Sequence, residues 1–475
     1  MVLRPWQVRR PRLGPERLTP LVVAVALFME NMDSNVIATS LPVIASDLGT
    51  DPLTMKLAVT SYLLALAVFI PASGWTADRY GARNVFRIAI GIFIVGSILC
   101  ATSYGLTQFI CGRIVQGAGG AMMTPVARLL LLRTVDKRSL VDAMAWLTIP
   151  ALVGPLVGPP LGGFITTYFA WHWIFTINVP IGVLGVFLVT RYIEDVRVEA
   201  LDPLDFTGML LAGIAVAGLA FGLSVAGLSI LPWQVVLTLL GVGSIAALGY
   251  ALHARRVAVP ALDFSLLASP CFRASFFGGS LFRIGVGAMP FLVPLLMQLG
   301  FGLSPFQSGM ITLSGALGAL TMKALAARTL RRFGFRRVLV VNSLISSAFI
   351  AAGALFVPGM PFAVIIAVLL IGGFFRSLEF TSIGTLAYAD LDASRMSRAT
   401  TLSSVGQQVS LSAGVALGAF VVDATLRWHG ETAIGADAFP PAFLIVGACS
   451  ALSVFSFMRL PPDAGEAMSG RRTGG

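Results

Sequence analysis

The stretch Asp78-Arg79-Tyr80-Gly81-Ala82-Arg83 has a counterpart, Arg331-Arg332-Phe333-Gly334-Phe335-Arg336, which begins 253 residues later, at position 331 against position 78. Both stretches are basic turns between long apolar runs. The first apolar run begins at residue 19, and the same offset leads from there to about residue 272, close to the start of the ninth run. The sequence therefore predicts two copies of one six-helix unit, although two unrelated basic turns would give the same local pattern.

Apolar runs of membrane-spanning length fill most of the chain. Of its 475 residues, 56% are hydrophobic and 12% are charged, and the mean hydropathy is +0.87. Soluble proteins carry about 25% charged residues. A bilayer core about 30 Å thick needs roughly 20 apolar residues per helix. We therefore predict an all-α membrane protein with fourteen transmembrane helices, at 19–42, 57–77, 85–103, 106–132, 140–167, 174–191, 207–225, 233–252, 273–297, 305–326, 337–356, 361–387, 400–422 and 439–459.

The basic residues indicate the orientation of these helices. If the N-terminus is cytoplasmic, 28 of the 33 Lys and Arg residues fall on the cytoplasmic side, and only Lys56 and Arg427 fall outside. Arg113, Arg283 and Arg376 lie at membrane depth. Cytoplasmic loops of membrane proteins are enriched in Lys and Arg, so both termini are predicted to be cytoplasmic. The net charge of +11 then belongs to these loops and does not indicate nucleic-acid binding.

The repeat and the helix count predict the domain organisation. A cytoplasmic tail (1–18) precedes an N-terminal six-helix bundle (19–198). Two inserted helices (199–262) follow, and then a C-terminal six-helix bundle (263–460) and a second cytoplasmic tail (461–475). Substrate in such paired bundles is handled at their interface, near the middle of the membrane.

Four segments resemble the fourteen-helix drug:proton antiporter branch (EmrB/QacA type) of the major facilitator superfamily. They are Phe28-Met29-Glu30-Asn31-Met32-Asp33 with Leu41-Pro42, the run 74–83 (GWTADRYGAR), the run 113–120 (RIVQGAGG) and the run 154–163 (GPLVGPPLGG). The resemblance implies the major facilitator fold and proton-driven export from the bacterial inner membrane, with protons as the coupling ion and no bound cofactor. Glu379 departs from the pattern, because an uncharged polar residue is expected there.

Two acids in the first predicted helix are the candidates for proton coupling. Glu30 and Asp33 are one helical turn apart and share a face. A carboxylate inside a membrane is costly, so it usually faces a cavity and has a function. We expect Asp33 to carry the proton, with Glu30 as the second candidate. The alternative is that Asp33 lies solvated and inert near the outer mouth. The resemblance implies that Arg113 takes part in proton transfer or tunes the acid, although it could instead bind backbone carbonyls.

The loop between the second and third helices is predicted to act as a conformational latch. Gly74 would allow close helix approach and Gly81 a tight turn, and Asp78 could lie at a helix N-terminus. Arg79 and Arg83 could bond helix ends or acidic groups. Ordinary cytoplasmic loop charge explains the arginines equally well, but it does not explain Asp78 and the glycines.

The fifth predicted helix is dense in small residues and prolines: Gly154, Pro155, Gly158, Pro159, Gly162 and Gly163. Small residues let membrane helices pack closely, and prolines remove backbone donors and bend the helix. This composition favours a gating helix that seals the two bundles against each other in one state, although close packing alone would also account for it.

Three further charges could line a substrate cavity. Arg376 and Glu379 are three residues apart and could pair along their helix, either as a static ion pair or as part of a substrate site. Arg283 has no partner visible in the sequence, and Glu379 is a candidate.

Other chemistries find no support in the sequence. The three histidines form no metal-binding set, and no phosphate-binding loop with a following Lys is present, so an ion gradient is the expected energy source. We expect a transporter rather than an enzyme, with the lipid bilayer, protons and a small molecule as partners. The alternatives are a transporter of one metabolite, such as a siderophore, organic acid or peptide, and a membrane sensor or scaffold that does not transport. The sequence does not indicate whether a periplasmic adaptor and an outer-membrane channel take part.

Overall fold

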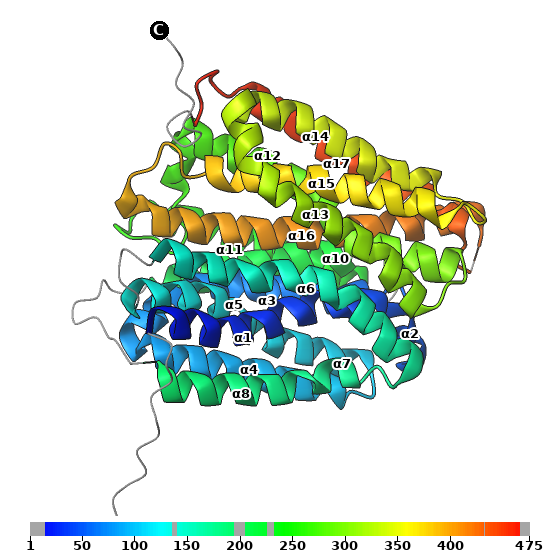
Figure 1. Ribbon diagram of the computed structural model, residues 1–475, viewed down its shortest axis with the longest axis horizontal. Coiled ribbons are helices and arrows are strands. Elements are labelled where there is room, and N and C mark those ends of the chain that lie inside the picture. The colour runs from blue at the N-terminus through cyan, green and yellow to red at the C-terminus, as the bar shows by residue number, and fades with distance from the viewer. Residues whose placement is uncertain (1–14, 135–139, 194–204, 226–231, 432, 466–475) are drawn as a thin grey trace, which may run out of the picture.

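The computed structural model describes residues 15–134, 140–193, 205–225, 232–431 and 433–465, and every regular element within these ranges is helical (Figure 1). The N-terminal half contains α1 (Pro15–Val36), η1 (Ile37–Thr39), α2 (Leu41–Asp47), α3 (Lys56–Tyr80), α4 (Ala82–Ala101), α5 (Leu106–Thr134), α6 (Leu140–Tyr168), α7 (Trp173–Thr176) and α8 (Asn178–Tyr192). The next segment contains α9 (Phe206–Val216), η2 (Ala217–Phe221), α10 (Gly222–Val225) and α11 (Trp233–Ala254).

The C-terminal half has the same order of long helices. It contains η3 (Phe264–Ala268), α12 (Pro270–Leu295), η4 (Leu296–Gly300), α13 (Pro305–Phe333), α14 (Phe335–Ala351), η5 (Ala352–Leu355), α15 (Phe362–Leu386), α16 (Ala393–His429), η6 (Ala436–Ala438), α17 (Pro440–Ala451) and α18 (Ser453–Met458). In Figure 1 this half, coloured from green through yellow to red, lies above the N-terminal half, which is coloured from blue through cyan to bluish green. The green α11 lies between them, and the segment α9–α11 packs against α3 and α16.

The predicted all-α membrane fold is confirmed, and its helices agree with the fourteen predicted spans. Thirteen helices in the described part of the chain are long and apolar enough to span a bilayer, and the 29-residue α6 is the fourteenth. An even number of spans brings the start of α1 and the end of α18 to the same end of the bundle, at the left of Figure 1. We call this the inner end, because the distribution of Lys and Arg predicts that it faces the cytoplasm, and we call the opposite end the outer end. The cytoplasmic location of the termini, and the domain limits at residues 198 and 262, stay predictions.

Several predicted helix limits differ from those in the structure, and two of the differences have a clear physical reason. The first span does not run to Pro42, because α1 gives way to the 3₁₀ turn η1. Pro42 lies in the first turn of the short helix α2, a position that proline tolerates because no interior helical bond needs its missing N–H. The thirteenth span starts at Ala393 instead of residue 400. The turns before residue 400 carry Arg395 and Arg398, which contact Ser265 and Asp263 near η3, so they do not extend the apolar run from which the span is predicted.

The two basic turns that suggest the repeat have matching geometry. Gly81 (φ +88°) separates α3 from α4, and Gly334 (φ +76°) separates α13 from α14. Such backbone conformations favour glycine. Arg83 donates from Nη2 to the carbonyl of Thr190, 3.0 Å away near the end of α8. Arg336 makes the equivalent bond, also 3.0 Å, to Met458 at the end of α18. The two turns are therefore one structural unit used twice.

Candidate functional site

A buried polar cluster surrounds Asp33 in the N-terminal half. Arg113 Nη1 on α5 lies 2.7 Å from Asp33 Oδ2. Oδ1 accepts hydrogen bonds from the side-chain amides of Gln116, at 2.8 Å, and Asn178, at 2.7 Å. Asp33 and Arg113 are each only 1% exposed. The carboxylate is therefore neither in bulk solvent nor against lipid, and it is held by donors from α5 and α8.

The guanidinium of Arg113 is fixed by other contacts as well. Its Nε donates to the carbonyl of Ala58 on α3, 3.3 Å away, and its carbon lies 4.3 Å from the centroid of the Tyr62 ring. Arg113 therefore binds both a carboxylate, that of Asp33, and a backbone carbonyl, that of Ala58, which the sequence suggests as alternatives. Sequence reasoning assigns no role to Gln116 and Asn178. The spacing of Arg113 and Gln116, three residues apart on one helix, is the signal that could have found Gln116.

Glu30 has a different environment from Asp33. It lines a cavity of about 810 Å³ that we call the inner cavity, and one carboxylate oxygen accepts a hydrogen bond of 3.3 Å from Thr124 on α5. The inner cavity lies between the halves: α1, α3 and α5 line it from one side, and α12, α13, α15 and α16 from the other. Its charged lining residues in the described part of the chain are Glu30, Arg128, Arg283 and Lys323. Of Glu30 and Asp33, only Glu30 therefore lines the cavity.

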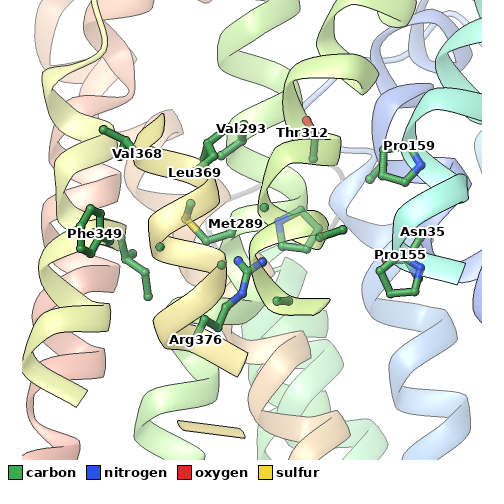
Figure 2. Close-up of a pocket in the computed structure, with 18 of the residues that line it drawn as sticks. Asn35, Pro155, Pro159, Met289, Val293, Thr312, Phe349, Val368, Leu369 and Arg376 are labelled. Atoms are coloured by element: carbon green, nitrogen blue, oxygen red, sulfur yellow. The ribbon is translucent and has the colours of Figure 1, made fainter. Parts of the chain in front are cut away.

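A second, smaller space lies further from the inner end. This central pocket has a volume of about 240 Å³ and is lined mainly by apolar side chains, among them Met289, Val293 and Phe349 (Figure 2). Within the described residues, Arg376 is its only charged lining residue. Helices α1, α12, α13 and α15 line both spaces. On α13, Ala319 lines the pocket and Lys323, one turn on, lines the inner cavity, so the two spaces follow each other along the bundle axis.

The three charges predicted for a substrate cavity do not form one group. Arg283 lines the inner cavity, with its guanidinium 5.7 Å from the Phe380 ring centroid. Arg376 lines the central pocket. Glu379 is 0% exposed and lines neither space, and its Oε2 accepts a 2.7 Å hydrogen bond from Asn342 on α14.

Glu379 pairs with neither arginine among the described residues. The structure therefore does not form the possible local pair with Arg376, and Glu379, the candidate partner of Arg283, does not pair with it either. The reason is that Glu379 is directed toward α14, whereas the two arginines reach the spaces between the halves.

The glycines and prolines of α6 serve two interfaces. A Cβ at Gly154, Gly158 or Gly162 would collide with α1 or η1, so this face packs within the N-terminal half. A Cβ at Gly163 would collide with the carbonyl of Pro305 on α13, and one at Gly309 with the carbonyl of Pro159. Pro155 and Pro159 also line the central pocket. One face of α6 therefore packs within the N-terminal half and the other contacts the C-terminal half, and whether that second contact acts as a gate stays a prediction.

The outer end is closed by contacts between the halves. Gln298 Nε2 donates to the carbonyl of Thr39 at 2.8 Å, and the Phe306 amide donates to Thr167 Oγ1 at 3.1 Å. Lys56 on α3 is 1% exposed, where α3 packs against α16. The molecule therefore has cavities toward the inner end and a packed outer end.

The predicted latch residues lie at the inner end. Arg83 bonds a helix end, as predicted, and Arg79 is exposed. Asp78 lies in the last turn of α3, and the helix that follows has Gly81 as its N-cap, so Asp78 does not cap α4. Gly74 makes no close helix contact in this conformation, because a Cβ there would meet nothing within 4 Å. Whether this loop acts as a latch stays a prediction.

Comparison with known proteins gives the family. The model of the Major Facilitator Superfamily matches residues 23–258 and 275–473. The chain is 36% identical over 458 residues to the "Putative multidrug resistance protein MdtD" of Salmonella paratyphi B, covering 94% of this chain and 95% of that one. It is also 36% identical over 444 residues to the protein of the same name from Pectobacterium atrosepticum, covering 93% and 95%. The chain belongs to the Major Facilitator Superfamily.

Solved structures agree with this assignment at the level of the fold. The human organic anion transporter MFSD10 superposes with a TM-score of 0.59 at 15% identity, over 94% of this chain and all of that one. A POT family transporter in complex with a thioalcohol-conjugated peptide superposes with a TM-score of 0.69 at 14% identity, over 92% and 94%. The family places this chain among multi-pass transporters of the bacterial inner membrane rather than among enzymes.

Proposed function

We propose that this protein exports small amphipathic organic compounds across the inner membrane in exchange for protons, by alternating access. The observation that carries the proposal is the position of Glu30 in the inner cavity, one helical turn from the buried Asp33–Arg113 pair. The names of the relatives, which are multidrug resistance proteins, support an organic substrate. The closed outer end and the cavities toward the inner end are the arrangement that an exporter needs in order to load substrate from the cytoplasm.

The geometry supports a division of labour between the two acids. Glu30 can exchange a proton with the inner cavity directly, because its carboxylate lines that space. Asp33 reaches solvent only if the α1–α5–α8 cluster opens, since Arg113, Gln116 and Asn178, which bind its carboxylate, are buried as well. A rocking of the two halves would change the exposure of both groups. Glu30 therefore exchanges its proton with the cytoplasm, and Asp33 changes its environment when the halves move.

Proteoliposomes test this proposal with three naphthalene probes of one ring size: naphthalenesulfonate (anionic), naphthalenesulfonamide (neutral) and naphthylmethyl-trimethylammonium (cationic). We expect at least one probe to bind, measured by quenching of protein fluorescence, and to move protons, measured with a trapped pH-sensitive dye. Glu30→Gln and Asp33→Asn should retain probe binding but lose probe-driven proton movement. Glu431→Gln removes an exposed carboxylate beyond α16 and serves as the control. Proton coupling is excluded if no probe moves protons, or if both acid variants move them at the wild-type rate.

A further inference from the structure

Arg376 lies in an apolar pocket without a counter-ion. Figure 2 shows its side chain rising from α15 into the central pocket, toward Met289. No hydrogen bond or ion pair joins Arg376 to any residue that the structure describes. The described lining of the pocket contains no Asp or Glu. Gly315 leaves room for the guanidinium, since a Cβ there would lie 3.5 Å from Arg376 Nη2. The cation is therefore accessible from the pocket.

An unpaired guanidinium in such surroundings is unfavourable. Burial of a charge in an apolar site costs free energy unless an opposite charge or several hydrogen bonds compensate it. Arginine offers a planar set of N–H donors that matches the two oxygens of a carboxylate or a similar oxyanion. Because the protein supplies no such group within the described residues, an incoming anion would complete the site.

The inner cavity, which leads to the central pocket, carries an excess of positive charge, as the pocket itself does through Arg376. Arg128, Arg283 and Lys323 line the inner cavity, against Glu30 as the one acid among its described lining residues. The Nε of Arg283 is buried and has no hydrogen-bond partner in the described structure. A cavity lined by an excess of one charge concentrates ions of the opposite charge. The inner cavity thus attracts anions and disfavours cations along the path that leads to Arg376.

The rest of the pocket limits the size and the character of the ligand. Phe349, Val293 and Leu369 offer apolar contact, and Asn35 and Thr312 add neutral polar groups. The volume of about 240 Å³ is below the roughly 300–1,000 Å³ of sites for drug-sized ligands. A compact ring or short chain fits this description better than a large multicyclic drug.

We propose that the central pocket binds compact amphipathic anions, with Arg376 holding the oxyanion and the apolar wall holding the hydrocarbon part. This inference rests on the proposed function and specifies its substrate class. Arg283 is assigned a role in attracting the anion from the inner cavity before it reaches Arg376. Neutral analogues lose the contact with Arg376, and cationic analogues are repelled by it.

The same three probes test the inference. We expect the wild-type protein to bind naphthalenesulfonate at least tenfold more tightly than naphthalenesulfonamide or the ammonium probe. Hydrogen bonds between a guanidinium and an anion are strong enough to give a difference of this size. Arg376→Gln should remove this preference by weakening anion binding about tenfold or more, with less than a twofold effect on the neutral probe. Arg376→Lys should restore part of the preference, because the positive charge is kept.

A matched control separates local from general charge effects. Arg256→Gln removes an exposed positive charge that follows α11, and it should leave all three affinities unchanged. Thermal unfolding in detergent checks that each variant is folded, and Arg376→Met, which also removes the charge, replaces Arg376→Gln if the latter does not fold. The inference is overturned if the wild-type protein prefers the cationic or the neutral probe, or if Arg376→Gln weakens all three probes equally. Proton movement driven by the cationic or neutral probe alone would overturn this inference but leave the proposed function intact.

Discussion

Glu30 and Asp33 lie one turn apart on α1, yet Glu30 lines the inner cavity whereas Asp33 is 1% exposed and ion-paired to Arg113. The difference arises from their neighbours. The acceptor atoms of Asp33 are taken by groups from α5 and α8, whereas Glu30 accepts a hydrogen bond from Thr124 and otherwise faces the cavity. Two acids on one face of a helix can therefore serve different steps of one transport cycle.

The Asp33–Arg113 pair should be essential for stability as well as for coupling. Asp33→Ala leaves the guanidinium buried without its counter-ion, which costs about 3–5 kcal/mol for a pair of this kind. We expect a clear fall in the thermal unfolding temperature in detergent. Removing both charges with Asp33→Leu and Arg113→Met should be less harmful than Asp33→Ala alone, because no charge is then left unpaired.

Two comparisons make this prediction specific. Glu30→Ala removes an acid from the same helix without leaving a buried ion-pair partner, so it should change the unfolding temperature much less. A double variant that is less stable than Asp33→Ala would show that Arg113 stabilises the cluster through its contacts with the Ala58 carbonyl and the Tyr62 ring rather than through charge compensation.

The charged members of this cluster can be located from the sequence, because charge inside a membrane is rare. Asn178 cannot, since a neutral amide carries no such penalty and its role depends on the packing of α8 against α1. For Gln116 the only signal is its position three residues after Arg113 on the same helix. The fourteen spans follow from hydropathy alone. The start of α16 does not, because its first turns carry Arg395 and Arg398, which contact Ser265 and Asp263 near η3.

Arg376 and Glu379 show the limit of spacing rules. Residues three apart on a helix are neighbours, so spacing alone predicts a local pair. In the structure Glu379 bonds Asn342 on α14, and Arg376 lies in the central pocket. Which neighbour a side chain meets is decided by how α15 is rotated against α13 and α14, and a single sequence contains no direct signal for that rotation.

The contact between α6 and α13 should control which end of the molecule is open. Gly163→Leu places a side chain against the carbonyl of Pro305, where even a Cβ has no room. We expect this substitution to separate the halves at the outer end and to favour a conformation open to the periplasm. Labelling of Asn35→Cys, which lies in the central pocket, by an impermeant maleimide added from outside should then increase severalfold.

Gly74→Leu is the matched control for this prediction. A Cβ at Gly74 would meet nothing within 4 Å, and the residue lies near the inner end of α3. The substitution should leave outside labelling of Asn35→Cys at the reference level in this conformation. Equal labelling in the Gly163→Leu and reference proteins would mean that the α6–α13 contact is not the outer gate.

The inserted segment should give the protein a pH-dependent stability through Asp205. Burial raises the pKa of this carboxyl, but hydrogen bonds from His253, at 2.6 Å, and from the amides of Gly208 and Ala261 outweigh it, so the pKa lies below the usual 3.8. A carboxyl with a lowered folded-state pKa stabilises the fold above the unfolded pKa and loses that contribution as the pH falls. The unfolding temperature should therefore fall as the pH drops from about 5 toward about 3, on either side of the unfolded carboxyl pKa. Asp205→Asn should reduce the slope of this dependence.

Asp437→Asn is the control, because it removes a carboxyl near the outer end, and it should leave the slope of the unfolding temperature against pH unchanged. The same slope in Asp205→Asn as in the reference protein would show that other carboxyls account for the acid sensitivity, because the asparagine keeps the size of the side chain but cannot titrate.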